Sequence, residues 1–122
     1  NYLVLGSSDK SEYLIGYFTK FGDGASDLTP ISSLYKLQVR EIAKYLKIPE
    51  NIISKRSSPH LWKDHEAEKE IGIQFEEVDA ILYCLFEEKK SIEKYKGEQS
   101  EYWKEVIGVE GDFKLEEEKQ EV

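Results

Sequence analysis

A short apolar run near the N-terminus constrains the fold more than any other feature of this sequence. Residues 2–5, YLVL, are uninterrupted apolar residues followed by Gly6, a pattern typical of a strand buried on both faces of a sheet. One strand does not make a stable sheet, and the rest of the chain shows helical spacing. The sequence therefore predicts an α/β fold that is mostly helical in this chain. Its strand would need neighbouring strands to form a stable sheet.

A helix is predicted directly after this strand. Asp9 followed three residues later by Glu12 is a capping-box pattern, so a helix should begin near Lys10 and run toward Phe18. In open α/β sheets, the carboxyl end of a strand and the start of the next helix form the usual ligand shelf. The following segment, KFGDGASDLTP, is rich in glycine and aspartate and is typical of an ordered loop.

Apolar spacing predicts the remaining elements. An amphipathic helix is expected over residues 31–47, and one of its faces carries a basic stripe of Lys36, Arg40, Lys44 and Lys47. A short helical turn from Pro49 through residue 53 precedes a loop, KRSSPHLW. A further helix runs through about residue 87, with one apolar face formed by Phe75, Val78, Ile81, Leu82, Leu85 and Phe86. A helix over residues 100–106 and a charged tail complete the chain.

Charge and apolar content exclude several classes of protein. The net charge of -8 argues against a broad nucleic-acid binder, which needs an excess of Lys and Arg on one face. No apolar run approaches the roughly 20 residues that cross a bilayer, and the N-terminus does not resemble a signal peptide. The one cysteine, Cys84, lies in the apolar run AILYCLF, which predicts a buried thiol in a reducing compartment. We therefore expect a cytoplasmic protein that binds neither nucleic acid nor membrane.

One stretch of irregular sequence carries a family resemblance. Residues 16–33 read GYFTKFGDGASDLTPISS, and the register continues through LYKLQVREIAKYLKIP to Pro49. The chain resembles the ammonia-dependent NAD synthetases, particularly the archaeal and bacterial forms, from about residue 3 to residue 85. A match this long, with irregular spacing of Gly, Asp, Lys and Pro, is far more specific than a short motif.

The resemblance implies both a fold and a reaction. The fold would be a partial Rossmann-like ATP-pyrophosphatase sandwich, similar to the adenine nucleotide alpha-hydrolases, with residues 1–108 as a partial NAD synthetase-like domain and residues 109–122 as an acidic C-terminal tail. The implied ligase transfers AMP from ATP to the nicotinate carboxylate of deamido-NAD, and ammonia then displaces AMP to give NAD. The expected requirements are ATP and Mg²⁺, and the expected assembly is a homodimer.

Three positions match residues of the family that contact ATP. Ser7 stands where the family usually has a threonine, Lys36 matches an ATP-contacting lysine, and Ser58 matches a phosphate-contacting hydroxyl. Each position also has an ordinary structural interpretation. Ser7 suits a turn or N-cap hydroxyl, Lys36 suits a solvated helix face, and Ser58 suits a loop.

Three further positions match residues of the family that bind the metal ion and the second substrate. Glu12 matches the magnesium-binding glutamate of the family, and a carboxylate is a ligand that Mg²⁺ prefers, although Glu12 is also the capping-box partner of Asp9. Lys20 and Asp27 match positions that contact deamido-NAD. They flank the sequence GDG, whose glycines permit close backbone approach but which alone reads as a plain turn.

The chain also departs from the family. The family's SGG-x-DS loop, which binds pyrophosphate through backbone N–H groups, precedes the matching region and is absent from these residues, so this chain alone is expected to bind Mg-ATP poorly. His60 stands in the aspartate position of the loop PSADLW. The run after that loop is altered to His65-Glu66-Ala67-Glu68, and the family's C-terminal His-Lys pair is not visible.

Two hypotheses of different class follow. The chain is the C-terminal part of an NAD synthetase whose N-terminal half is truncated, disordered or a separate polypeptide, or it is a non-catalytic synthetase-derived module that has lost the ATP loop and binds a partner. Joint retention of the six matched positions favours the first, and the departures favour the second. His60, His65, Glu66 and Glu68 also suggest a metal site, but without a metal-binding motif an accidental cluster is the preferred interpretation.

Overall fold

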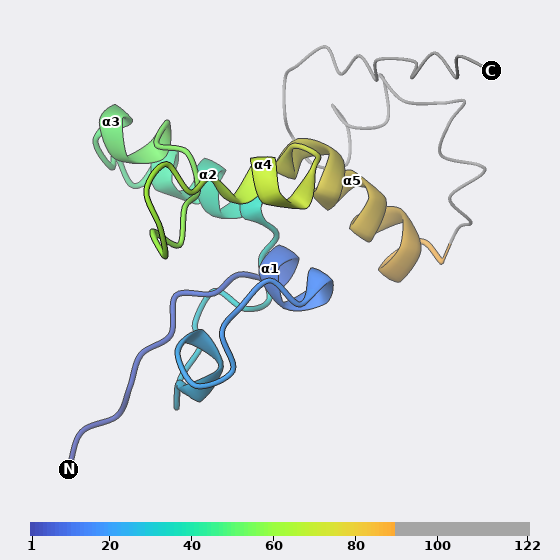
Figure 1. Cartoon of the computed structure of the whole chain (residues 1–122). Coiled ribbons are helices and arrows are strands. Elements are labelled where there is room, and N and C mark those ends of the chain that lie inside the picture. The colour runs from blue at the N-terminus through green and yellow to red at the C-terminus, as the bar shows by residue number, and fades with distance from the viewer. Residues whose placement is uncertain (90–122) are drawn as a thin grey trace.

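The computed structural model describes residues 1–89. The helices in this range are α1 (Lys10–Ile15), the short 3-10 helix η1 (Asp23–Ala25), α2 (Lys36–Tyr45), α3 (Glu50–Ile53), α4 (Ala67–Ile71) and α5 (Phe75–Phe86). Helix α1 packs against α2 and α5, and α2 also contacts α5 and α3. Figure 1 shows this group of helices with the N-terminal segment extending away from it. The predicted helix at 100–106 and the predicted tail at 109–122 lie outside the described residues.

The N-terminal segment differs from the predicted buried strand. Residues 2–5 are all exposed, and 71% of Leu3 is accessible to solvent. Leu5 forms an isolated parallel bridge with Leu28, flanked by backbone hydrogen bonds of 2.7 and 3.1 Å. The prediction of burial on both faces is wrong for the described part of the chain, because that part contains no further strand beside this one.

Helix α1 begins where the capping box predicts. The Glu12 N–H donates to the Asp9 carboxylate at 3.0 Å, and the Asp9 N–H donates to the Glu12 carboxylate at 3.1 Å, so two donors at the helix start are satisfied. The helix ends at Ile15 rather than near Phe18, because Gly16 adopts a left-handed conformation with a φ of 73°. This conformation ends many helices and favours glycine.

The other helices lie near their predicted positions. Helix α2 begins at Lys36 rather than at residue 31, because Tyr35 is extended and the preceding residues form turns and a bend. The helical turn after Pro49 is confirmed as α3. Helix α4 was not predicted, since its short charged sequence, AEKEI, gives no apolar periodicity. No helix within residues 1–89 is long and apolar enough to cross a membrane.

A small apolar core forms on one side of α5. Its buried members are Tyr35, Ala67, Phe75, Val78 and Leu82. The predicted apolar face of α5 is therefore confirmed in part, but Ile81 and Leu85 are only half-buried and 52% of Phe86 is exposed. Cys84 is buried, as its apolar neighbours predict.

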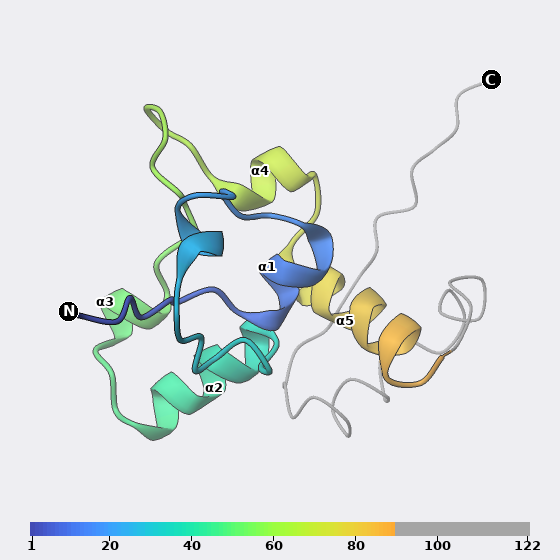
Figure 2. The same ribbon diagram turned by 90° about the horizontal axis from the view of Figure 1, so that it is seen from below.

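A buried carboxylate joins three helices at the edge of this core. Asp79 of α5 is completely buried and accepts hydrogen bonds from the Ser11 hydroxyl of α1 and from the Leu37 N–H of α2, the latter at 2.8 Å. Burial raises the pKa of Asp79 to about 6, because loss of hydration disfavours the charged form. Figure 2 shows α1, α2 and α5 meeting in this region. Asp79 thereby fixes how α1 and α2 are placed relative to each other.

Candidate functional site

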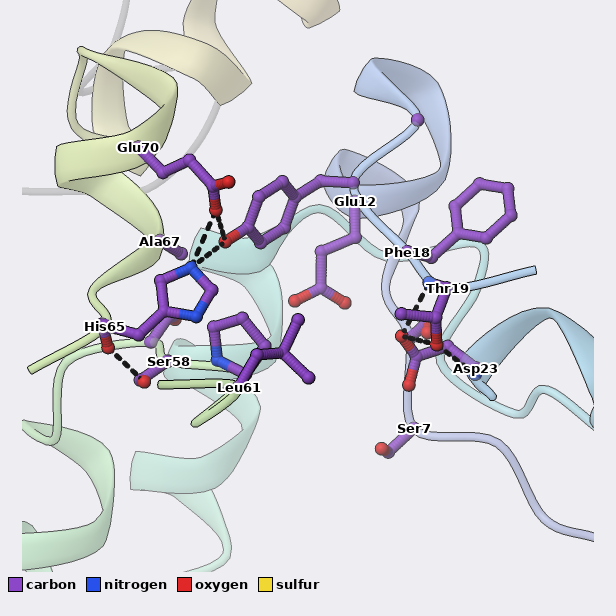
Figure 3. Close-up of a pocket in the computed structure, with 15 residues that line it drawn as sticks. Ser7, Glu12, Phe18, Thr19, Asp23, Ser58, Leu61, His65, Ala67 and Glu70 are labelled. Carbon is purple, nitrogen blue, oxygen red and sulfur yellow. Dashed lines mark hydrogen bonds and ion pairs between the residues drawn. The ribbon is translucent and has the colours of Figure 1, made fainter. Parts of the chain in front are cut away.

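A pocket of about 460 Å³ lies between α1 with the segment that follows it and α4 with the loop that precedes it. This volume is within the range of small-molecule sites. Figure 3 shows one wall carrying Glu12, Phe18, Thr19 and Asp23 and an opposite wall carrying Ser58, Leu61, His65 and Glu70. The left-handed turn at Gly16 allows the first wall to form, because it directs the chain away from the axis of α1.

Ser7, Glu12 and Ser58, which are three of the six matched positions, line this pocket. Ser58 is held within its own loop, since its hydroxyl donates to the His65 carbonyl and accepts from the His60 N–H at 3.1 Å. Segments that are distant in sequence therefore bring two hydroxyls and one carboxylate to one cavity.

Lys36 lies behind the pocket, not in its lining. Its Nζ is 2.7 Å from Asp9 Oδ2 and 2.7 Å from Glu12 Oε1, and 4.7 Å from the centre of the Phe75 ring. Burial lowers the pKa of Lys36, but the ion pairs with Asp9 and Glu12 outweigh this effect and hold the pKa above its usual value. The ammonium is therefore charged and offsets part of the negative charge of the two carboxylates.

The predicted basic stripe of α2 is used in ion pairs within the chain. Arg40 lies 2.7 Å from Glu76, and Lys44 lies 2.6 Å from Glu41. Together with the two ion pairs of Lys36, these contacts remove much of the local positive charge that the sequence suggests. Lys47, the fourth member of the predicted stripe, is exposed and lies beyond the end of α2.

Lys20 and Asp27 lie outside the pocket lining. Lys20 is exposed, and its Nζ is 5.2 Å from the centre of the Phe21 ring. Asp27 is also exposed, and its carboxylate accepts a hydrogen bond from the Val4 N–H at 2.8 Å. The described residues therefore do not bring the two positions matched to deamido-NAD into the cavity that holds the other three.

A hydrogen-bonded trio of Tyr17, His65 and Glu70 forms part of the pocket wall. The Tyr17 hydroxyl donates to Glu70 Oε2 at 2.6 Å, and His65 Nε2 lies 2.7 Å from the same oxygen and 3.2 Å from the Tyr17 hydroxyl. Burial, followed by the hydrogen bond to Glu70, raises the pKa of Tyr17 to about 12. The hydrogen bonds from Tyr17 and then His65 lower the pKa of Glu70. Glu70 is therefore ionised and accepts both bonds.

The four side chains that the sequence suggests for a metal site do not converge on one point, because each has a different environment. His60 is exposed, whereas His65 is buried. Glu66 accepts hydrogen bonds from Arg56 at 2.7 Å and from Lys69 at 2.9 Å. Glu68 accepts a hydrogen bond from the Phe75 N–H at 3.2 Å. Within residues 1–89, no group of three or more His, Cys, Asp or Glu side chains is arranged to hold a metal ion.

A sequence profile of the NAD synthase family matches residues 1–121. The chain belongs to this family. A relative from Staphylothermus marinus, an NH(3)-dependent NAD(+) synthetase, is 55% identical over 94 residues, which are 77% of this chain and 34% of the relative. A relative of the same name from Picrophilus torridus is 56% identical over 98 residues, which are 79% of this chain and 39% of the relative.

A solved structure is also similar to this chain. The chain is similar to the structure of NMN synthetase from Francisella tularensis, with a TM-score of 0.63 and 41% identity, over 75% of this chain and 37% of that chain. The predicted family resemblance is thus confirmed, and the fold is NAD synthetase-like. The chain spans about a third of the length of the curated relatives named above.

Sequence reasoning did not find the trio in the pocket wall. Tyr17 and His65 are separated by 48 residues, and neither belongs to a local pattern that predicts a hydrogen bond between them. The sequence marks His65 as part of an altered run after the loop and as one of four candidate metal ligands, neither of which indicates these contacts. The one available signal was a histidine three residues after Trp62, and the two rings do stack, with centroids 3.4 Å apart.

Proposed function

We propose that this chain forms part of the active site of an ammonia-dependent NAD synthetase, an enzyme that amidates deamido-NAD to NAD at the expense of ATP. The observation that supports this proposal best is the gathering of Ser7, Glu12 and Ser58 at one pocket in a chain of the NAD synthase family. In this reaction the nicotinate carboxylate attacks the α-phosphorus of ATP and pyrophosphate leaves. Ammonia then attacks the acyl adenylate, loses a proton and releases AMP.

The proposed ATP site uses the two serine hydroxyls and Lys36. Hydroxyl groups donate well to phosphate oxygens, because a hydrogen bond to a charged acceptor is stronger than one to a neutral acceptor. Ser7 and Ser58 face the cavity from different segments. Lys36 would offset carboxylate charge beside the triphosphate, because its Nζ lies 2.7 Å from both Asp9 and Glu12. A less negative wall favours a reaction in which negative charge moves onto pyrophosphate.

Glu12 is the proposed protein ligand of Mg²⁺. Its carboxylate lines the pocket, and Mg²⁺ is commonly held by one or two carboxylates together with phosphate oxygens of the substrate. One Glu12 oxygen also faces Lys36 at 2.7 Å, so Glu12 would share its charge between the lysine and the ion. The donor chemistry fits Mg²⁺ bound with ATP. When bound, the ion would neutralise charge on the phosphates.

Deamido-NAD would contact Lys20 and Asp27 in this proposal. Both side chains are exposed on the segment that contributes Thr19 and Asp23 to the pocket wall. A dinucleotide is long enough to extend from the cavity along this segment. The substrate would then lie partly outside the pocket, which agrees with the separation of Lys20 and Asp27 from the ATP positions.

The proposal extends to fold and assembly. The exposed segment at residues 2–5 supports a partial Rossmann-like sandwich, because an apolar strand of that class pairs with neighbouring strands. We propose residues 1–108 as the partial domain and 109–122 as an acidic tail, in a cytoplasmic homodimer.

Light scattering of the chimera described below would give a mass twice that of one chain, and a monomeric mass would contradict the dimer.

A chimera tests the proposed reaction. In the Staphylothermus marinus relative, the matched segment is replaced by the corresponding residues of this chain, and NAD formation from deamido-NAD, ATP, Mg²⁺ and ammonia is followed. We expect turnover by the chimera, no turnover by the 122-residue chain alone, and loss of turnover in chimeric Glu12→Ala. Lys44→Ala is the matched control, because Lys44 lies in an exposed ion pair. A folded but inactive chimera would favour the non-catalytic hypothesis.

The same assay addresses the substrate. The similar structure from Francisella tularensis is named an NMN synthetase, so the mononucleotide analogue of deamido-NAD is offered in parallel. The higher identity to the NAD(+) synthetases, 55% against 41%, leads us to expect preference for the dinucleotide. A preference for the mononucleotide would move the proposal to NMN synthesis.

A further inference from the structure

The loop that carries Ser58 closes upon itself. The Ala67 N–H donates to the Ser57 carbonyl at 2.9 Å, and the Ser58 hydroxyl donates to the His65 carbonyl. The His60 N–H donates to the same hydroxyl at 3.1 Å. The position of the Ser58 oxygen therefore depends on where the backbone of His65 is held.

The side chain of His65 anchors that backbone. It is only 2% exposed, stacks on Trp62 with an interplanar angle of 13°, and reaches across the pocket wall to Tyr17 and Glu70 through Nε2. Tyr17 belongs to the segment after α1, and Glu70 belongs to α4. The histidine thus links the Ser58 loop to both neighbouring segments.

Only one ring nitrogen of His65 takes part in this link. Ionised Glu70 can only accept, so Nε2 carries the hydrogen that lies between His65 and Glu70 at 2.7 Å. Nδ1 is buried without a hydrogen-bond partner among the described residues. A buried polar atom without a hydrogen-bond partner costs free energy. The ring is therefore held in this position by its Nε2 contacts, at the expense of Nδ1.

From these contacts we infer that His65 is a positioning residue for Ser58. Its Nε2–H, held by Glu70 and Tyr17, fixes the loop so that the Ser58 hydroxyl stays in the pocket. There the hydroxyl oxygen accepts one hydrogen bond, from the His60 N–H. The hydroxyl hydrogen can then exchange from the His65 carbonyl to a phosphate oxygen without movement of the serine. The inference rests on the proposed function for the identity of the ligand, a phosphate group of ATP.

The first test needs no ligand. In the full chain, the His60 amide proton reports its bond to the Ser58 hydroxyl by its NMR shift and its exchange rate, and Ser58→Ala defines the value without this bond. His65→Leu should move the His60 amide to the Ser58→Ala value. His65→Gln should retain the native value, because the glutamine amide nitrogen reaches the place of Nε2. His65→Asn should not, because its amide nitrogen corresponds to Nδ1.

The two isosteric variants separate positioning from simple packing. A native His60 signal in His65→Leu, or equal signals in the Gln and Asn variants, would overturn the inference. If His65→Leu fails to fold, as judged by circular dichroism, Tyr17→Phe decides. It removes one hydroxyl that contacts Glu70 and His65 and should shift the His60 amide part of the way, whereas an unchanged signal would count against the link.

The second test uses the active chimera and ATP. His65→Leu should raise KM for ATP by about tenfold, the scale of one hydrogen bond to a charged group, with a smaller effect on KM for deamido-NAD. The same change in a Ser58→Ala background should have little further effect, since the two residues act through one contact. Independent, multiplicative effects would overturn the inference. The matched control is Lys44→Ala, which changes an exposed ion pair on α2. Failure of the unsubstituted chimera to make NAD would instead contradict the proposed function, and the ligand-free test would still decide on His65.

Discussion

At the scale of single residues, the described structure is organised by buried charges that have partners. Lys36 faces Asp9 and Glu12, and Asp79 faces the Ser11 hydroxyl and the Leu37 N–H. A buried charge costs free energy unless it is paired and hydrogen-bonded. These side chains therefore contribute both to the stability of α1 and to the placement of the pocket beside it.

Removing the Lys36 ammonium should strongly destabilise the chain. The Asp9 and Lys36 side chains are 3% and 13% exposed, so Lys36→Met leaves two carboxylates without their cation in a poorly solvated site. We expect a loss of about 3–5 kcal/mol in the free energy of unfolding, measured by urea denaturation. Lys44→Met, in an ion pair whose side chains are 55% and 42% exposed, should cost less than about 1 kcal/mol. Similar losses in both variants would contradict this account.

Asp79 should give the stability a specific pH dependence. Its pKa rises from 3.8 to about 6 on folding because of burial, so the folded chain binds the proton more tightly than the unfolded chain. Stability from this group is therefore present below the unfolded pKa and is lost as pH rises through about 6. Asp79→Asn lacks this titration. The free energy of unfolding of the native chain should rise relative to the variant between pH 7 and pH 5, and a constant difference in urea melts would refute the shift.

At the scale of elements, local signals set where helices begin and end. The Asp9 and Glu12 pair starts α1, and left-handed glycines end α1 and α4 at Gly16 and Gly72. The basic stripe of α2 shows the limit of this reasoning. Spacing placed three of the four cations on α2, whereas Lys47 lies beyond its end. It did not reveal their partners, because Lys36 and Arg40 face carboxylates of other elements, including Glu76 of α5, and only Lys44 pairs within α2.

The C-cap of α1 gives a prediction that depends on backbone conformation alone. A Cβ at Gly16 would meet no atom within 4 Å, yet the φ of 73° is unfavourable for residues with side chains. We expect Gly16→Ala to lower the free energy of unfolding by about 1 kcal/mol. Gly16→Asn should cost less, because asparagine tolerates this conformation. Urea melts that rank alanine above asparagine would show that the turn is not held in this form.

At the scale of the whole molecule, the chain exposes surface that a complete fold would cover. It spans about a third of the length of the relatives named above, and the apolar residues 2–5 are accessible to solvent. The pocket has walls from the segment after α1 and from the loop before α4, while the positions matched to deamido-NAD lie beside it. These features agree with our proposal that the chain contributes one portion of a larger active site.

The Leu3→Lys substitution should affect the chain alone and the chimera differently. Because 71% of Leu3 is exposed here, Leu3→Lys should change the free energy of unfolding of the 122-residue chain by less than about 0.5 kcal/mol. In the chimera, where this segment is proposed to pair with other strands, the same change should cost about 2 kcal/mol or more. Thermal melts of both proteins make the comparison. Equal effects would contradict the proposed sandwich.

The sequence by itself determined the features that depend on near neighbours. It placed the start of α1 and the region of α5, and it identified Cys84 as buried and the family as NAD synthase. Caps and apolar periodicity involve residues within a turn or two of each other, so their chemistry is visible in one short segment.

Only the tertiary structure decided which charges meet and which matched positions share a cavity. Ser11 and Asp79 are 68 residues apart, and Tyr17 and Glu70 are 53 apart. No local pattern encodes such pairs, because they depend on how whole helices pack. Whether the N-terminal strand is buried and paired also depends on the tertiary structure. A strand acquires its buried faces and its hydrogen bonds from neighbours that lie elsewhere in a fold, and residues 1–89 supply just one bridge, between Leu5 and Leu28.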